Sequence, residues 1–335
     1  MPHEPSGMSA EDRLIARYFR PLAKHPGALR LIDDVAMLTP IYGHDIVLTT
    51  DAIVGGVHFF LEDSADLVAK KALRVNLSDL AAKGATPIGF LLALALPEGT
   101  SEFWIESFAQ GLSTDADSYS CPLLGGDSVR TPGPTTVSIT ALGTLPQGTM
   151  VPRSGARVGD HIVVTRTIGD AALAVVLRKG TGGSNGWQLN DRQRFDLIDR
   201  YLLPQPRNAL ADALRLHASA AMDVSDGLVG DLAKLCAASN VTAEVVIERV
   251  PLSDAAKRVL VADGAQMETI LTGGDDYEIL CTVGADKLTS FRAAAVAAGV
   301  PVTEIGHVIE GKEAPRFLGR DGKPMVFKQT SFSHF

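Results

Sequence analysis

The stretch DIVLTTDAIVGGVHFFLEDSADLVAKKALRVNLSDLAAKGATPIGFLLALAL, residues 45–96, determines the fold class of the first half of the chain. It opens with a strand-like run, Asp45–Asp51, and closes with a second apolar run, Ile88–Leu96. Between them, Ser64 caps a long amphipathic helix that ends at Gly84. A strand, a helix and a strand in succession predict an α/β protein.

Helix and strand patterns alternate through the rest of the chain. The periodicity predicts helices over Glu11–Arg20, Ser101–Ser113 and Ala171–Lys179, and strands over Thr135–Leu145 and His161–Thr165. In the second helix, the side chains expected to face inward are Phe103, Trp104, Phe108 and Leu112. Strand, helix and turn signals continue from Ala221 to Val308, so the α/β pattern extends over both halves.

The length of 335 residues is over twice that of a typical domain and predicts two compact domains. The segment VPRSGARVGD, Val151–Asp160, is dense in turn-forming residues and precedes a fresh strand. We therefore expect two domains, one over residues 1–150 and the other over residues 151–335.

Composition excludes several classes of protein. The formal charge of −8, without clustered Lys and Arg, argues against a nucleic-acid surface. The longest apolar run is far shorter than the roughly 20 residues that span a bilayer, and the polar start is unlike a signal peptide. The three cysteines are far apart and odd in number, which favours a reducing cytoplasm.

Aspartates recur where strands or helices should end. These clusters are Asp33-Asp34, Thr49-Thr50-Asp51, Asp79, Gly125-Gly126-Asp127, Asp223-Val224-Ser225-Asp226-Gly227 and Gly273-Gly274-Asp275-Asp276. Any one of them is more often a turn or a helix cap than a functional site. Gathered at one cleft, however, the carboxylates would repel one another, and several divalent cations would relieve that repulsion. Carboxylates are the ligands that Mg²⁺ prefers, together with substrate phosphates and water.

The usual nucleotide-binding motifs are missing: the sequence has no GxxxxGK[ST] phosphate loop, no GxGxxG after a strand and no HRD or DFG pair. Phosphoryl transfer needs positioning and charge stabilisation rather than covalent help from the protein. Metal-bound aspartates can supply both, so the composition of these clusters fits a Mg²⁺-dependent kinase.

The ordered motifs also carry a resemblance to a known family. They are LIARYF at Leu14, the Asp33 pair, TTD ending at Asp51, HF at His58, VNLSDLAAKGA at Val75, GGD at Gly125, RSGA at Arg153, MDVSDGL at Met222, GGDDYE at Gly273 and the terminal SHF. With these motifs the chain resembles the thiamine-monophosphate kinases, part of a superfamily that includes aminoimidazole ribonucleotide synthetase.

The resemblance implies the two-domain α/β fold of that superfamily, with an N-terminal sheet that pairs with a second subunit's sheet in a homodimer. It implies a cytoplasmic kinase that uses ATP and several Mg²⁺ ions to convert thiamine monophosphate into thiamine diphosphate, the last step in making that cofactor. Transfer would be direct and in line, and no residue is expected to act as a general acid or base, because the attacking phosphate oxygen is already ionised.

The resemblance also implies roles for individual residues. The positions that match Mg²⁺ ligands are Asp34, Thr49, Thr50, Asp51, Asp79, Asp127, Asp223 and Asp226. The positions that match ATP contacts are Gly126, Arg153 and Ser225. The positions that match contacts to thiamine monophosphate are His58 and Asp275, and Phe332 is the ring expected to stack on the substrate.

The sequence departs from the family at four positions. Ile32 replaces the usual Gly before the aspartate pair and Asp275 replaces a Glu, whereas Arg166 and Ala174 both stand where relatives commonly carry Gly. Two alternatives therefore stay open. One is another ATP-using enzyme of the superfamily, although selenophosphate synthetase and the hydrogenase-maturation dehydratase would need a terminal cysteine that this chain lacks. The other is a catalytically silent protein that binds a thiamine phosphate.

Overall fold

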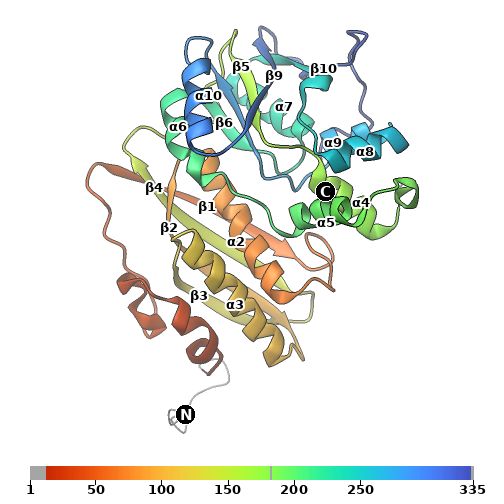
Figure 1. Ribbon diagram of the computed structural model, residues 1–335. Helices are drawn as coiled ribbons and strands as arrows, with labels where there is room; N and C mark the ends of the chain where they lie inside the picture. Colours follow the sequence, from red (N-terminus) through yellow and green to blue (C-terminus); the bar gives the residue numbers. More distant parts are fainter. Residues whose placement is uncertain (1–12, 182, 333–335) are drawn as a thin grey trace. The chain divides into compact units, whose positions relative to one another are not determined.

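The computed structural model describes residues 13–181 and 183–332, and the chain divides into two compact units (Figure 1). The first unit comprises Met1–Leu80 and Thr86–Gln147, and the second comprises Ala81–Ala85 and Gly148–Phe335. The first two residues of the predicted helix Glu11–Arg20 and the terminal SHF motif lie outside the described residues.

The first unit is built on a four-stranded sheet with the order β1-β4-β2-β3. Its strands are β1 (His44–Val54), β2 (Thr86–Pro97), β3 (Leu123–Thr131) and β4 (Thr136–Pro146). The strand β4 runs antiparallel to both of its neighbours, whereas β2 and β3 are parallel. β1 and β3 are therefore the two edges of this sheet.

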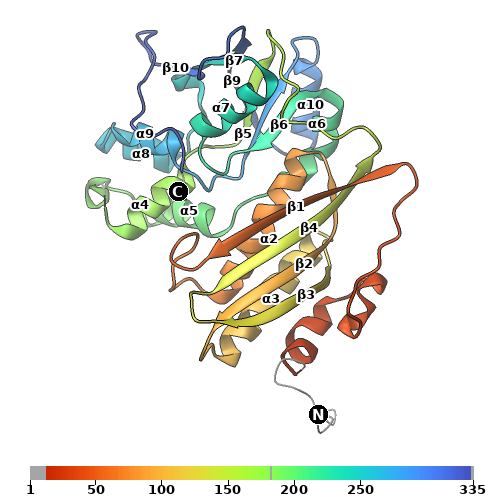
Figure 2. The same cartoon turned by 180° about the vertical axis from the view of Figure 1, so that it is seen from behind.

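Two helices, α2 (Ala65–Ala82) and α3 (Glu102–Ser118), cover one face of this sheet, and Figure 2 shows the opposite face uncovered. Ser101 caps α3 by accepting a hydrogen bond from the Trp104 N–H at 3.2 Å. Phe108 and Leu112 are buried as predicted, but the prediction for Phe103 is wrong, because its exposed fraction is 80%. The helix turns this ring to solvent, since Phe103 follows the cap by only two residues and precedes the buried stripe.

The uncovered face of the sheet is largely apolar. Along β1 the residues alternate in exposure, with Ile46 and Leu48 on the open face and Ile53 buried on the helix face. Leu48 is 63% exposed, and Leu91 on β2 and Val129 on β3 are exposed as well. An apolar sheet face of this kind is typical of an interface with another protein surface.

The described part of the helix predicted for Glu11–Arg20 is helical throughout, but beyond Leu14 it is not a regular α-helix. The structure has a π-helical turn, Ile15–Phe19, followed by two 3₁₀ turns, Arg20–Leu22 and Pro26–Leu31. A proline at position 21 removes a backbone donor and ends the regular helix.

The second unit contains a six-stranded sheet with the order β10-β7-β9-β5-β8-β6. Its strands are β5 (His161–Thr165), β6 (Ala218–Asp223), β7 (Thr242–Val246), β8 (Ile279–Val283), β9 (Val302–Ile309) and β10 (Arg316–Leu318). All neighbouring pairs are antiparallel except β10 and β7. The central strand β5 has the bounds that the sequence predicted.

Helices flank this second sheet. They are α4 (Asp170–Lys179), α5 (Asp191–Leu202), α6 (Ala211–His217), α7 (Leu228–Ser239), α8 (Asp254–Ala262), α9 (Gln266–Thr272) and α10 (Leu288–Ala297), with 3₁₀ turns at Ser184–Gly186, Asn208–Leu210 and Ile247–Arg249. Leu214 of α6 and Phe291 of α10 pack with Val163 of β5 in one apolar core. The mixed α/β class predicted from the sequence is therefore confirmed.

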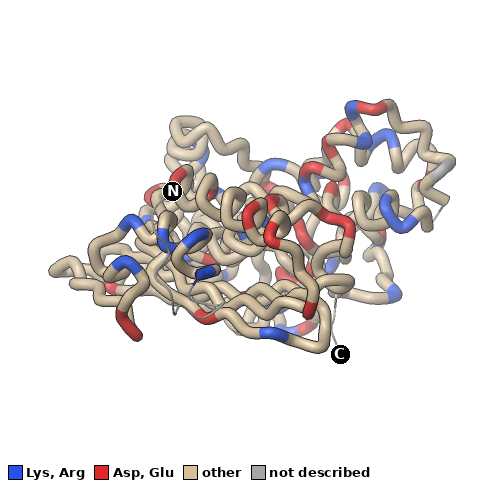
Figure 3. The backbone as a smooth tube through the Cα atoms, turned by 90° about the horizontal axis from the view of Figure 1, so that it is seen from below, with Lys and Arg blue, Asp and Glu red and all other residues tan. Residues whose placement is uncertain are grey.

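No helix among the described residues is long and apolar enough to cross a membrane. Figure 3 shows acidic and basic residues interspersed along the backbone, in keeping with a formal charge of −8 rather than a basic binding surface.

Candidate active site

The first group of predicted metal ligands lies between β1 and α2. The Thr49 hydroxyl donates to the Asp79 carboxylate at 2.5 Å. The Asp51 N–H donates to the Asn76 side-chain oxygen at 3.1 Å, and the Asn76 amide in turn donates to the Ala72 carbonyl. Asn76 and Asp79 are three residues apart on α2, so both reach β1 from one helix face. The helix thus holds the side-chain oxygens of Thr49 and Asp79 together and fixes the backbone of Asp51 on the same strand.

Thr50 points to the other face of the sheet. Its hydroxyl donates to the Ile139 carbonyl at 3.2 Å and accepts a hydrogen bond from the Thr140 hydroxyl at 3.1 Å. Successive side chains on a strand alternate between faces, so the three consecutive residues Thr49, Thr50 and Asp51 cannot all present side chains to one ion on the same face.

A second group of predicted ligands gathers at the opposite edge of the sheet. Asp34, Gly126 and Asp127 line a cavity of about 690 Å³ in the first unit, together with Asp33. Most of the other lining residues are apolar, including Leu91 and Leu142 from the open sheet face. The cavity therefore combines a carboxylate-rich side with an apolar wall, a combination that suits a ligand with a ring and a charged end.

Gly126 has a structural reason for being glycine. Its φ is +159°, and a Cβ at this position would lie 1.9 Å from the Leu92 carbonyl oxygen of the adjacent strand. A side chain at this position would therefore separate β3 from β2. The structure thus accounts for the glycine by strand packing, and its contact with ATP stays a prediction.

The two groups of ligands stand at the two ends of one row of paired residues. Asp51 pairs with Ile139 on β4, Ile139 pairs with Leu92 on β2, and Leu92 pairs with Gly126 on β3. Three strand spacings separate the ends of the row, about 14 Å at roughly 4.8 Å per spacing. A single copy of this sheet does not bring Asp51 and Asp127 to one ion.

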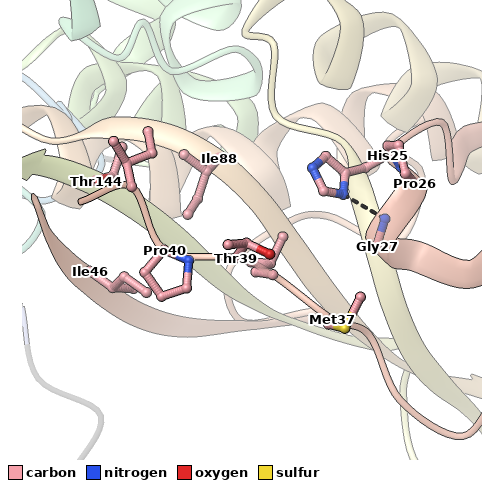
Figure 4. A pocket seen from close by; sticks show the side chains of 11 residues that line it. His25, Pro26, Gly27, Met37, Thr39, Pro40, Ile46, Ile88 and Thr144 are labelled. Carbon is pink, nitrogen blue, oxygen red and sulfur yellow. Dashed lines mark hydrogen bonds between the residues drawn. The ribbon is translucent and has the colours of Figure 1, made fainter.

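A second cavity of about 370 Å³ adjoins the first, since Leu38 lines both, and is bounded by the segment around Met37 (Figure 4). Ile46, Ile88 and Thr144 contribute the sheet side of its wall. The His25 Nδ1 accepts a hydrogen bond from the Gly27 N–H at 2.9 Å. The residues that line this cavity include no carboxylate, so it does not qualify as a site for Mg²⁺.

His58 lies on the loop that follows β1. Its Nδ1 accepts a hydrogen bond from the Val54 N–H at 3.0 Å, which assigns the proton of the neutral ring to Nε2. Lys71, which is buried on α2, donates to the His58 carbonyl at 3.0 Å. Both bonds fix the backbone and the ring plane of His58, so the tautomer that can donate from Nε2 is set by the fold.

In the second unit, the segments Asp223–Gly227 and Gly273–Tyr277 lie side by side, where β6 ends and β8 begins. The Asp275 N–H donates to the Ser225 carbonyl at 2.9 Å, and the Tyr277 N–H donates to the Val224 carbonyl at 2.8 Å. A Cβ on Gly274 would lie 2.3 Å from the Ser225 oxygen, so glycine permits this approach. The fold thus brings Ser225 and Asp275 together, although they are 50 residues apart in sequence.

Two residues that the sequence did not single out support the first of these loops. The buried Asp231 carboxylate accepts hydrogen bonds from the backbone N–H groups of Ser225 and Asp226 at 3.0 and 2.9 Å. Lys234 bridges the Asp231 and Asp226 carboxylates. Burial raises the pKa of Asp231, whereas the hydrogen bonds to the two aspartates outweigh burial and raise the pKa of Lys234. The only sequence signal for them is their spacing after the SDG turn.

A second cluster, of which the sequence singled out only Asp276, supports the Gly273–Tyr277 loop. The Asp276 carboxylate accepts the Gly169 N–H at 2.8 and 2.9 Å, and burial, reinforced by nearby Asp170, raises the pKa of Asp276 well above its ordinary range. The buried Glu278 pairs with Arg200 and Arg207. These contacts hold in place the loop that carries Asp275.

Two further predicted residues occupy different positions around α7. The Phe332 N–H donates to the Asp226 carbonyl at 3.0 Å, so the end of the chain lies against the loop that precedes α7. The Arg153 carbonyl instead accepts from the Ser239 hydroxyl at the last residue of α7, and the Arg153 side chain is exposed. The predicted ATP contacts Arg153 and Ser225 therefore lie at opposite ends of this helix.

Comparisons with known proteins agree with this division into two units. The family model for AIR synthase related protein, N-terminal domain, matches residues 32–145, and the model for the C-terminal domain matches residues 157–317. The chain is 45% identical over 315 residues to a thiamine-monophosphate kinase of Caulobacter vibrioides, covering 92% of this chain and 87% of the relative.

Solved structures are similar over nearly the whole chain. The crystal structure of a thiamine-monophosphate kinase from Stenotrophomonas maltophilia K279a superposes with a TM-score of 0.81 at 38% identity, covering 96% of this chain and 98% of that one. A structure described as AaThiL complexed with AMPPCP and TMP superposes with a TM-score of 0.76 at 31% identity, covering 90% and 91% of the two chains.

Proposed function

Because the chain belongs to the thiamine-monophosphate kinase family, within the AIR synthase related proteins, we propose that it transfers the γ-phosphoryl group of ATP to thiamine monophosphate. The product is thiamine diphosphate, and the reaction is the last step in making this cofactor. The observation that carries the proposal is the identity of 45% over 92% of the chain, combined with the ordered aspartate motifs that carry the resemblance.

The oxygen-rich groups fit Mg²⁺, whose ligands in proteins are carboxylates, hydroxyls, phosphates and water. The residues that would hold the ions are Asp34, Thr49, Thr50, Asp51, Asp79, Asp127, Asp223 and Asp226. When bound, Mg²⁺ neutralises the phosphates and stabilises charge on the transferred group. The fit rests on the Thr49 to Asp79 contact and on the cavity that Asp34 and Asp127 share.

The remaining site residues bind and orient the two substrates. Gly126, Arg153 and Ser225 serve ATP, with the Arg153 guanidinium suited to phosphate oxygens. His58, Asp275 and Phe332 serve thiamine monophosphate. The hydrogen bond from Asp275 to Ser225 supports this division, because it sets a substrate contact directly beside a nucleotide contact. The terminal phosphate oxygen of the substrate is ionised at neutral pH, so no side chain needs to remove a proton.

We also propose that the chain acts as a homodimer through the open face of the first sheet. Its support is the apolar face with Leu48 and Val129 exposed and the separation of Asp51 from Asp127 at opposite edges. In a two-fold dimer, an edge of one sheet can meet the other edge of its partner sheet. Residues 1–150 would then supply metal, ATP and dimer contacts, and residues 151–335 would close over nucleotide and substrate.

The alternatives have less support. Burial raises the pKa values of Cys121, Cys236 and Cys281 to about 12, so these thiols are poor nucleophiles for a cysteine-dependent enzyme of the superfamily. All three are free, which supports a location in the reducing cytoplasm. The chain would be a silent binding protein only if having Asp275 in place of the family's Glu abolished turnover.

A product assay tests the proposed function. The purified chain is incubated with ATP, excess Mg²⁺ and thiamine monophosphate, and thiamine diphosphate is measured by chromatography. Parallel reactions contain thiamine or an aminoimidazole ribonucleotide precursor and are followed by ADP release. We expect ADP release that matches diphosphate formation with the monophosphate. Binding of thiamine monophosphate without any product would instead identify a silent binding protein.

A further inference from the structure

Three potential metal ligands lie together on the second sheet, among residues to which the proposed reaction gives no role. His161 begins β5, and Glu304 and His307 lie on its neighbour β9. One ligand atom from each of the three side chains lies within 4.8 Å of the others. They are part of the second unit and are remote in sequence from every aspartate assigned to Mg²⁺ there.

An irregularity in strand pairing brings these side chains to one face. His161 pairs with His307 and Ile162 pairs with Gly306, but Val163 pairs with Glu304, so β9 carries one extra residue. In a regular strand, residues three apart would point to opposite faces. The bulge turns Glu304 and His307 to the same face, and bulges commonly re-aim a side chain in this way.

The distances match those between two ligands of one metal ion. His161 Nδ1 lies 3.0 Å from Glu304 Oε1, and His307 Nε2 lies 3.5 Å from the same oxygen. Ligand atoms about 2.1 Å from a Zn²⁺ ion stand about 3.0 Å apart in octahedral geometry and about 3.4 Å apart in tetrahedral geometry. Only the distance between the ligand nitrogens of His161 and His307 needs to shorten. His307 has room to turn because its side chain is 47% exposed.

The state of the ligand atoms also favours a metal. His161 Nδ1 is buried and, despite its distance of 3.0 Å from Oε1, makes no hydrogen bond of acceptable geometry. An unpaired buried nitrogen calls for a partner.

The arginines around Glu304 leave the inner oxygen accessible to a metal. Arg292 of α10 donates to Oε2 at 2.7 Å, the oxygen that faces away from the two rings. Such a bond orients a ligating carboxylate from outside. Arg249 lies 3.9 Å from Oε1 and is half exposed, so a bound cation can displace this weak contact.

We propose that His161, Glu304 and His307 form a binding site for a first-row transition-metal ion, Zn²⁺ in particular. Two imidazoles and one carboxylate suit Zn²⁺ far better than Mg²⁺, which prefers oxygen ligands. Three protein ligands leave a position for water. Because the site joins β5 to β9 in the middle of the sheet order, a bound ion links two central strands and stabilises the second unit.

Metal binding by matched variants tests the site. Chelator-treated protein is titrated with ZnCl₂ by calorimetry in excess MgCl₂, which occupies the carboxylate-rich positions. A separate chelator-treated sample is titrated with CoCl₂, and binding is detected by visible absorption. The single variant is His307→Gln, which changes a half-exposed residue. The double variant carries both His161→Gln and His307→Gln. The matched control is His44→Gln, which removes an imidazole from the first unit.

We expect the parent and His44→Gln to bind one more equivalent of Zn²⁺ than the double variant. Loss of an outer contact commonly weakens metal binding about 10- to 100-fold, so His307→Gln should weaken Zn²⁺ binding at least about 10-fold. Zn²⁺ should also raise the melting temperature of the parent more than that of the double variant. Equal stoichiometry and equal affinity in the parent and the double variant, with both folded by circular dichroism, would overturn the site.

Discussion

Asp51 and Gly126 are the two ends of a single row of paired residues that crosses the four strands of the first sheet. The row passes through Ile139 and Leu92 and spans about 14 Å. Asp51 faces α2, whereas Asp127, the neighbour of Gly126, lies at the rim of the cavity on the other edge. If both aspartates serve the same phosphates, a second copy of the sheet must supply one of them.

Mixing two inactive variants distinguishes a shared site from one within a single chain. Asp51→Asn and Asp127→Asn should each lower turnover by orders of magnitude while leaving the melting temperature unchanged or higher, because fewer carboxylates are crowded together. Asp223→Asn should do the same. If Asp51 and Asp127 meet across a two-fold dimer, each mixed dimer regains one intact site, and random exchange should restore roughly a quarter of the parental activity.

The controls for this experiment come from the same chain. Mixing Asp51→Asn with Asp79→Asn should restore nothing, because Thr49 and Asp79 are in contact within one chain and both variants damage the same group. Restoration by neither mixture would mean that each chain carries a complete site. Steady-state thiamine diphosphate formation after subunit exchange is the measurement.

Asp275 should affect thiamine monophosphate more than ATP. Its φ is +72°, a left-handed conformation that Asp tolerates better than most residues. We expect Asp275→Ala to raise KM for thiamine monophosphate well beyond any change in KM for ATP. Asp275→Glu should remain active with a modest change in KM. A variant Asp275→Ala with an unchanged KM for the monophosphate but impaired ATP binding would place this residue on the nucleotide side.

Asp231 should be required for both stability and activity. Replacement by Ala leaves the backbone N–H groups of Ser225 and Asp226 without their acceptor, a loss that costs about 2 kcal/mol in the free energy of unfolding. Turnover should fall as well, because that loop carries two predicted ligands. The matched control is Asp254→Ala, since Asp254 also pairs with a lysine three residues later but its side chain is 94% exposed. Its effect on urea unfolding should stay below about 0.5 kcal/mol.

Arg166 offers a stabilising substitution. Its φ is +41°, and a left-handed conformation costs a residue with a Cβ about 1–2 kcal/mol. Arg166→Gly should therefore raise the free energy of unfolding by up to about 1 kcal/mol after the entropy of glycine is subtracted. Arg166→Ala keeps the Cβ and should bring no such gain. Thermal unfolding of the two variants beside the parent decides the matter.

The buried Asp276 should make stability depend on pH in a defined direction. Its folded-state pKa lies above the ordinary 3.8, so the folded form binds the proton more tightly than the unfolded chain. The contribution of Asp276 to the free energy of unfolding therefore falls as pH rises from about 4 through the folded-state pKa. Asp276→Asn cannot titrate, so its stability relative to the parent should be greater at pH 8 than at pH 4.5 in urea unfolding. The opposite trend would mean that Arg200 and Gly169 overcome the cost of burial.

The strands and helices that the sequence predicted well are those whose signals are local. Ser101 caps α3 and the apolar run at Ile88–Leu96 lies within β2, as expected from capping and hydrophobicity. The strand β3 was missed, because Gly125 and Gly126 are poor strand formers by composition. Their reason for being glycine is the closeness of Leu92, a contact that only pairing across the sheet creates.

The candidate site was predictable only as a set of residue types. Aspartates at element ends indicated metal binding, and the family resemblance supplied their roles. Nothing in the spacing of Asp51 and Asp127 indicated that strand order would put them at opposite edges. Asp231 and Glu278 were missed for the same reason, since their partners come from distant segments or from backbone groups that carry no sequence signal.

The hydrogen bond from the Phe332 N–H to the Asp226 carbonyl affects where a purification tag should be placed on this protein. A purification tag joined to the chain shortly after Phe332 would lie close to this hydrogen bond. A disturbance of that hydrogen bond would also disturb the Asp223–Gly227 loop, whose geometry affects the activity that an assay measures. Kinetic comparisons between variants are therefore best made with the carboxyl end left native and the tag at the other end, or removed.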